Sequence, residues 1–106
     1  MTEVEESAWI QDLLDEARRD LVFLLNIANG SFGGPDEMPS PPVRYELMER
    51  IVDGLVHGGC LVGFGDIDFY VPDELKVAKS ELSTTLVRLY AQKTKDYELV
   101  TFLIRD

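Results

Sequence analysis

The sequence predicts an α+β domain: three helices, a β-hairpin and a C-terminal strand that together form a small sheet. Three observations support this class. Apolar residues recur at steps of three and four in three segments, they alternate with other residues in a fourth, and they fill nearly every position of the last. At 106 residues, the chain has room for one compact domain with a modest core, which we place over residues 1–106.

The first helix is expected from Ser7 to Ala28, where Asn29 and Gly30 would end it. Its apolar stripe consists of Ile10, Leu13, Leu14, Ala17, Leu21, Leu24, Leu25 and Ala28. Trp9, ahead of this stripe, could cover the core or anchor a partner, and the usual burial of tryptophan favours the core. Residues 29–42 contain several glycines and prolines without any period, which predicts a flexible loop.

Ser40 is the expected N-cap of the second helix, with Pro41 and Pro42 in its first turn and Gly58-Gly59 at its end. Its stripe consists of Tyr45, Leu47, Met48, Ile51, Val52 and Leu55. Pro72-Asp73-Glu74 is expected to be the start of the third helix or the approach to it, and this helix should fade near Lys93-Thr94-Lys95. Its stripe consists of Ala78, Leu82, Leu86, Leu89 and Tyr90.

Residues 60–71 alternate as a β-hairpin would if Gly65 and Asp66 formed a two-residue turn. That register places one set of facing pairs on a buried side: Phe64 with Ile67, Val62 with Phe69, and Cys60 with Val71. The outer side then receives Leu61, Gly63, Asp68 and Tyr70. A slip by one residue would bury the acids, so burial selects this register.

The last segment is apolar on both faces, as expected of a strand that is covered on both sides or paired in the middle of a sheet. Val100, Phe102 and Ile104 would face one way, and Leu99, Thr101 and Leu103 the other. The order helix, helix, hairpin, helix, strand is winged-helix-like.

The chain is acidic, with 20 Asp and Glu against 10 Lys and Arg and a formal net charge of −10. Acids outnumber bases seven to two in residues 1–20 and nine to two in residues 29–74, whereas bases prevail after residue 75. This balance repels phosphate backbones and anionic lipid, so we expect a basic protein partner, no nucleic acid and no membrane. One cysteine, and no apolar stretch typical of a leader or a membrane span, predict a cytoplasmic protein.

The sequence contains no combination of residues typical of catalysis, and we expect no enzyme activity, cofactor or metal. His57, beside Gly58, suits a hydrogen bond to the last helical carbonyls. Cys60 could pair with it as a nucleophile, but the hairpin register buries this thiol. One histidine and one cysteine cannot build a standard zinc site, and the aspartates of residues 66–73 lack the spacing of a calcium loop.

A helix followed by a hairpin also suggests DNA binding through a recognition helix and a wing. The charges oppose this hypothesis. The second helix carries Glu46, Glu49 and Asp53 against two arginines, and the hairpin tip carries further aspartates. Proteins that release phosphate counterions need basic residues at these positions.

The last two-thirds of the chain resembles a group of small bacterial proteins, some of them similar to immunity proteins of polymorphic and contact-dependent toxin systems. The shared pattern is a helix ending in "GLV", a short "GD" hairpin leading to an aromatic residue and a proline, and a closing apolar strand with an aromatic. The matching residues are Gly54, Leu55, Val56, Gly65, Asp66, Phe69, Val71, Pro72 and Phe102. These are turn and core positions, so the resemblance implies a fold and carries no catalytic residue.

Small size, acidity and this resemblance favour an immunity or antitoxin-type protein that neutralises a basic toxin domain, such as a nuclease, by electrostatic and steric occlusion. The alternative is an acidic adaptor or regulatory module with a winged-helix-like core. The predicted partner-binding residues are the outer-face residues of the hairpin and the following turn: Asp66, Asp68, Tyr70, Asp73 and Glu74. Other candidates are Asp12, Asp15 and Glu16 on the first helix and Asp36 and Glu37 in the loop.

Overall fold

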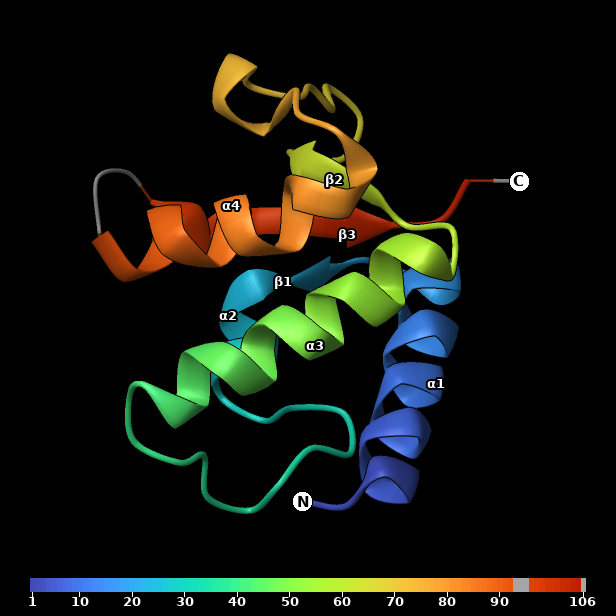
Figure 1. Ribbon diagram of the computed structural model, residues 1–106. Coiled ribbons are helices and arrows are strands. Elements are labelled where there is room, and N and C mark those ends of the chain that lie inside the picture. The colour runs from blue at the N-terminus through green and yellow to red at the C-terminus, as the bar shows by residue number, and fades with distance from the viewer. Residues whose placement is uncertain (93–95, 106) are drawn as a thin grey trace.

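The computed structural model describes residues 1–92 and 96–105 and confirms the α+β class, with four α-helices and one three-stranded sheet in this part of the chain (Figure 1). Likeness to a winged helix is compatible with this arrangement and stays a prediction. The helices are α1 (Glu3–Arg19), α2 (Leu24–Ala28), α3 (Val43–His57) and α4 (Lys79–Gln92). The strands are β1 (Val22–Phe23), β2 (Leu61–Phe64) and β3 (Val100–Leu103), and two 3-10 turns are η1 (Asp73–Leu75) and η2 (Tyr97–Leu99).

The C-terminal strand β3 lies in the middle of an antiparallel sheet with the order β1-β3-β2. All four of its residues are buried, which confirms the prediction of a strand covered on both sides. Phe102 pairs with Val22 of β1 on one side and with Val62 of β2 on the other. Phe102 therefore joins three strands that are distant in the sequence: β1 near the N-terminus, β2 in the middle of the chain and β3 near the C-terminus.

The predicted helix from Ser7 to Ala28 is wrong over its second half. Helix α1 ends at Arg19, and the chain then forms β1 before α2 begins. Val22, which does not belong to the predicted stripe, is fully buried because it pairs with β3. The Asn26 Oδ1 atom accepts a hydrogen bond from the Phe23 backbone N–H at 2.8 Å, which supports the new helix start. The pairing of Val22 and Phe23 with β3 therefore outweighs the helical periodicity of the sequence in this segment.

The start of α3 also differs from the prediction. Ser40 is not the N-cap, because the helix begins after Pro42, whose carbonyl accepts the Glu46 N–H at 3.2 Å. Ser40 contributes only its backbone carbonyl, to Arg44 N–H. The predicted end is confirmed: Gly58 caps the helix, and its N–H donates to the Gly54 carbonyl at 2.9 Å.

The predicted two-residue hairpin is wrong, since β2 pairs along its whole length with β3 and meets residues 67–71 at one bridge only. A single bridge joins Phe64 to Tyr70 across a longer loop. Ile67, expected in the core, is 92% exposed, and Phe69 is only half-buried. The physical reason is that β3 is apolar on both faces and buries the residues of β2 better than a local partner strand would. Asp68 and Tyr70 are exposed, as expected.

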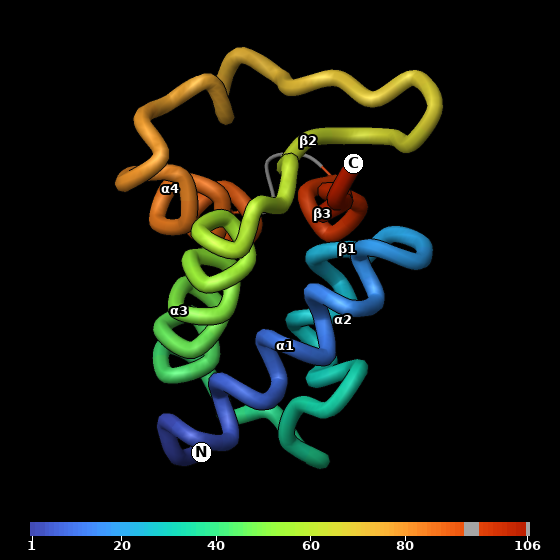
Figure 2. The backbone as a smooth tube through the Cα atoms, turned by 90° about the vertical axis from the view of Figure 1, so that its right-hand side faces the viewer, coloured from blue at the N-terminus to red at the C-terminus, as the bar shows by residue number. Residues whose placement is uncertain are grey.

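Residues 65–78, which we call the arch, connect β2 to α4 across the top of the molecule (Figure 2). The segment Pro72-Asp73-Glu74 leads into η1, and α4 begins later, at Lys79. Leu86 of its stripe is fully buried. The expected end of this helix at Lys93-Thr94-Lys95 lies outside the described residues.

The loop of residues 29–42 contains turns and bends without a helix or strand. The core holds it at two points. Met38 is buried, and Trp9 is fully buried, as predicted. The indole Nε1–H of Trp9 donates to the Ser31 carbonyl at 2.7 Å, so α1 is tied directly to this loop.

Candidate partner-binding surface

All five predicted partner-binding residues lie on the arch and are exposed. Asp66 and Asp68 belong to the loop after β2, and Asp73 and Glu74 belong to η1. Tyr70 stands between these two pairs along the chain and is 59% exposed. The predicted residues therefore lie exposed along one continuous segment, which forms without the predicted hairpin.

The ring of Tyr70 is held in place by other aromatic rings. It stacks on Phe64 with the ring centroids 5.7 Å apart and an angle of 27° between the planes. Phe64 in turn contacts Tyr97, whose side chain is 1% exposed, at the same centroid distance. Two backbone hydrogen bonds between Phe64 and Tyr70, of 2.8 and 3.0 Å, fix the same junction. An exposed ring is therefore anchored to the core, with little freedom left to lose on binding.

Cations also reach the arch, so the local charge is less negative than the sequence of this segment suggests. The Arg105 guanidinium donates to the backbone carbonyl of Asp66 and lies 5.5 Å from the centroid of the Phe69 ring. Lys76 forms an ion pair with Asp73 at 3.2 Å, but both side chains are largely exposed, so this pair contributes little stability. Within the described residues, the carboxylates of Asp66 and Asp68 have no ion-pair partner.

The alternative acids of the first helix form a separate patch. Asp12, Asp15 and Glu16 line a hollow of about 260 Å³ together with Arg19 and Phe32. Phe32 is 41% exposed and has a positive φ of 62°, an uncommon conformation for a bulky residue. Contact between this loop residue and α1 was not expected from the sequence, because more than a dozen residues separate them.

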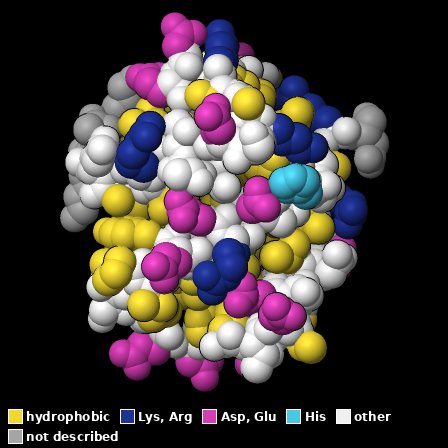
Figure 3. Space-filling model, viewed as in Figure 1, with side chains coloured by type: hydrophobic (Ala, Val, Ile, Leu, Met, Phe, Trp, Pro, Cys, Tyr) yellow, Lys and Arg dark blue, Asp and Glu magenta, His cyan; other side chains and the backbone are white. Residues whose placement is uncertain are grey.

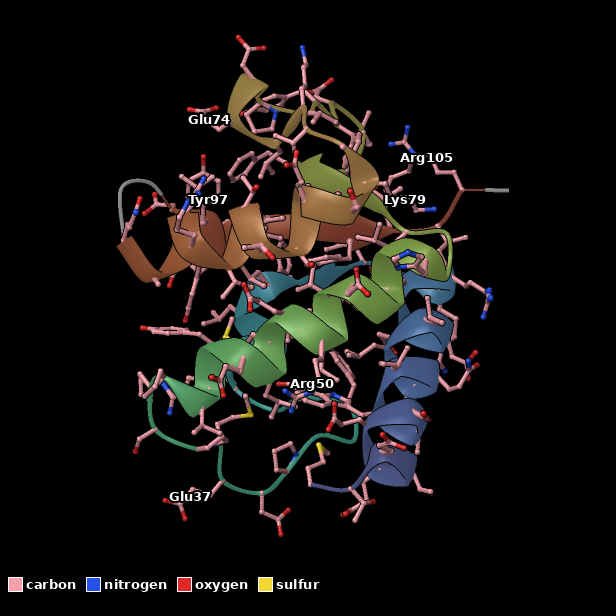
Figure 4. The ribbon with its side chains drawn as sticks, viewed as in Figure 1. Glu37, Arg50, Glu74, Lys79, Tyr97 and Arg105 are labelled. Atoms are coloured by element: carbon pink, nitrogen blue, oxygen red, sulfur yellow. The ribbon has the colours of Figure 1, made fainter. Side chains whose placement is uncertain are left out.

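The acids of the loop lie far from the arch. Figure 4 shows Glu37 at the bottom of the molecule and Glu74 at the top. Asp36 and Glu37 are both exposed. A partner of ordinary size that covers the arch would not need to touch this end of the molecule.

A third group of acids, on α3, is not among the partner-binding residues predicted from the sequence. Glu46, Glu49 and Asp53 line a hollow of about 350 Å³ with Arg50 and with Ser83 of α4. Figure 3 shows acidic side chains gathered around a basic one on this face. The Arg50 guanidinium donates to the Glu6 carboxylate of α1 at 2.8 Å, and this hydrogen bond raises the pKa of Arg50. Spacing of three and four residues between the α3 acids is the signal that could have identified the group.

Cys60 and His57 show no arrangement for nucleophilic catalysis. Cys60 is 8% exposed, and burial raises the pKa of its thiol to about 11, which leaves little thiolate at neutral pH. The His57 ring donates from Nδ1 to the Asp53 carbonyl at 2.8 Å, the helix-end contact expected from the sequence. Among residues 1–92 and 96–105, no three His, Cys, Asp or Glu side chains cluster in a way that could hold a metal ion.

Helices long and apolar enough to cross a bilayer are absent from the described residues. Protein-family models, curated proteins and solved structures give no match to this chain. The geometry of the described residues is therefore the ground for a functional proposal.

Proposed function

We propose that this protein is an immunity or antitoxin-type protein of the cytoplasm, which binds a basic toxin domain, such as a nuclease, and blocks it. One observation carries the proposal. The exposed ring of Tyr70 is anchored through Phe64 to the buried Tyr97 and stands between two pairs of exposed acids on the arch. A rigid aromatic residue inside a charged rim is typical of binding hot spots.

The remaining acidic patches support the same function through the long-range field. With a net charge of −10, the protein attracts a basic domain from a distance, and the patches on α1 and α3 add to this attraction. Such steering raises the association rate, whereas an aromatic residue that becomes buried in the complex mainly slows dissociation. Fast association suits an inhibitor that must reach its target before the target acts.

The test is a kinetic binding assay with the product of the neighbouring gene, which the proposal predicts to contain a basic toxin domain. Changing Asp66 and Asp68 to Lys should slow association by about tenfold at low salt and flatten its salt dependence. The matched control changes Asp12 and Asp15 to Lys, because it alters the net charge equally at a different patch. A slower association in the arch variant than in the control is expected.

Tyr70→Ala should speed dissociation by about thirtyfold, as expected for a hot-spot residue, whereas Tyr70→Phe keeps the ring and should stay close to the parent protein. Amide spectra of each variant serve to check whether Phe64 and Tyr97 remain packed. Equal affinity of all arch variants, with the fold intact, would exclude the arch as the interface.

Growth of cells that express the toxin domain distinguishes this function from the alternative. An immunity protein restores growth, and the arch variants restore it less well. Binding to the basic partner without any protection would favour an acidic adaptor or regulatory module instead.

A further inference from the structure

The hollow between α3 and α4 carries more negative charge than its surroundings neutralise. We call it the α3–α4 hollow and define it by the residues that line it: Glu46, Glu49, Arg50, Asp53 and Ser83. Its three acids are spaced by three and four residues, so they share one face of α3 and repel one another. A cation placed among them would relieve this repulsion.

Arg50, the cation that lines the hollow, is engaged by an acid outside it. Arg50 follows Glu46 by four residues, a spacing that favours an ion pair along a helix. Its guanidinium instead reaches toward α1, where Nε and Nη2 donate to the Glu6 carboxylate at 2.8 and 3.4 Å (Figure 4). The positive charge of Arg50 is therefore matched by Glu6 and leaves the acids of the hollow available.

These acids have few partners of their own. Within residues 1–92 and 96–105, neither Glu46 nor Glu49 forms an ion pair. Asp53 has its Oδ1 atom 3.4 Å from Nδ1 of His57, at the C-terminal end of α3. The middle of the hollow thus presents carboxylate oxygens that can accept hydrogen bonds from a cation.

Ser83 of α4 adds an unused hydroxyl to the same hollow. The residue is 7% exposed, and a serine buried in a helix commonly donates its hydroxyl to the carbonyl four residues earlier. The described part of the chain gives the Ser83 hydroxyl no hydrogen-bond partner. Because Ser83 lines the hollow and its oxygen is not sealed from solvent, a ligand can reach this hydroxyl there.

We infer that the α3–α4 hollow binds the guanidinium group of an arginine side chain from a partner protein. Carboxylates of α3 accept its N–H groups on one side, and the Ser83 hydroxyl of α4 accepts one on the other. A guanidinium has five N–H donors in one plane, which suits acceptors that come from two helices. It is also less strongly hydrated than an ammonium group, so it enters a half-covered site at a lower cost.

The lining residues of the hollow all lie outside the arch, so this inference does not rest on the proposed function. It adds a specific contact for a basic partner at a second place on the molecule. The arch provides an aromatic ring inside a charged rim, whereas the α3–α4 hollow provides acceptors for a single cationic group.

The test is a titration of the full-length, isotope-labelled protein, at physiological salt, with a short synthetic peptide that has one arginine among glycines. Matched peptides carry lysine or citrulline at that position, and citrulline keeps the shape of arginine without its charge. The arginine peptide should shift the amide signals of Glu49, Asp53 and Ser83 together. Its dissociation constant should be at least about threefold lower than that of the lysine peptide, and the citrulline peptide should leave these signals unchanged.

Two pairs of variants locate the site. Ser83→Ala removes the hydroxyl without breaking a hydrogen bond within the described residues, and it should weaken binding of the arginine peptide by about threefold to tenfold. Its control is Thr84→Ala, at an exposed neighbour outside the hollow. Glu49→Gln should weaken binding by a similar factor, and Glu81→Gln makes the same change of charge at an exposed acid of α4 that does not line the hollow.

Three outcomes would overturn the inference: shifts centred on the acids of α1, unchanged binding by a folded Ser83→Ala variant, or equal losses in the Glu49 and Glu81 variants. If Ser83→Ala alters amide signals throughout the protein, the Glu49 and Glu81 pair decides. Tighter binding of free spermidine than of the arginine peptide would assign the hollow to a polyamine and would also overturn it. None of these measurements uses a toxin domain or an arch variant, so failure of either proposal leaves the other open to its own test.

Discussion

Trp9 joins α1 to the loop of residues 29–42, and its replacement by Phe should measure the strength of that connection. The change removes the 2.7 Å hydrogen bond from Nε1–H to the Ser31 carbonyl, a loss of about 1 kcal/mol. It also removes part of a fully buried ring system, which costs a further 1–2 kcal/mol or so. We expect the free energy of unfolding to fall by about 2–3 kcal/mol in total, a large share of the stability of a small domain.

Gly34 lies against the indole of Trp9 and allows a second measurement of the same packing. A Cβ atom at Gly34 would lie 2.6 Å from Trp9 Cζ2 and 2.6 Å from the Gly30 carbonyl oxygen. Gly34→Ala should therefore cost about 1–3 kcal/mol in the parent protein. In the Trp9→Phe background the cost should be smaller by at least about 0.5 kcal/mol, because the outer part of the indole is gone while the Gly30 contact remains.

Urea denaturation followed by far-ultraviolet circular dichroism measures both quantities. Trp9 is the only tryptophan of the chain, so intrinsic tryptophan fluorescence cannot be used for its variants. The slope of the transition should stay constant, which indicates an unchanged amount of surface exposed on unfolding. A loss below about 0.5 kcal/mol for Trp9→Phe, or strict additivity with Gly34→Ala, would refute the tight packing of this loop on α1.

Two further predictions use the burial of single side chains. Phe102→Ala should lower the free energy of unfolding by about 3–5 kcal/mol, because its ring is fully buried in the central strand. Ile67→Ala should change this free energy by less than about 0.5 kcal/mol, because Ile67 is 92% exposed. Urea denaturation measures both, and a larger loss for Ile67→Ala than for Phe102→Ala would favour the two-residue hairpin instead. Cys60 has a thiol pKa of about 11, so at pH 8 its alkylation should be roughly a hundredfold slower than that of free cysteine. Because this pKa is raised in the folded state, stability should decline as pH rises from about 9 to 11, and this part of the decline should be absent in Cys60→Ala; equal pH profiles of the two proteins would contradict it.

The sequence by itself determined the features that depend on local periodicity and on the chemistry of single residues. The end of α3 at Gly58, the burial of Trp9 and the covered C-terminal strand are of this kind. So is the exposure of Asp68 and Tyr70, since a carboxylate or a phenol beside turn residues seldom enters a core. The α+β class follows from the same local signals.

Only the tertiary structure decided which strands pair and which distant residues meet. Strand β3 takes Val22 and Val62 as partners, which breaks the first predicted helix and replaces the expected hairpin. The contact between Arg50 and Glu6 and the position of Phe32 beside the α1 acids arise in the same way.

The physical reason is that an apolar strand with two open edges is satisfied by whichever segments bury the most surface against it, however distant they are along the chain. The apolar pattern of a segment indicates that it must be buried against another segment. Which segment that is depends on the whole fold.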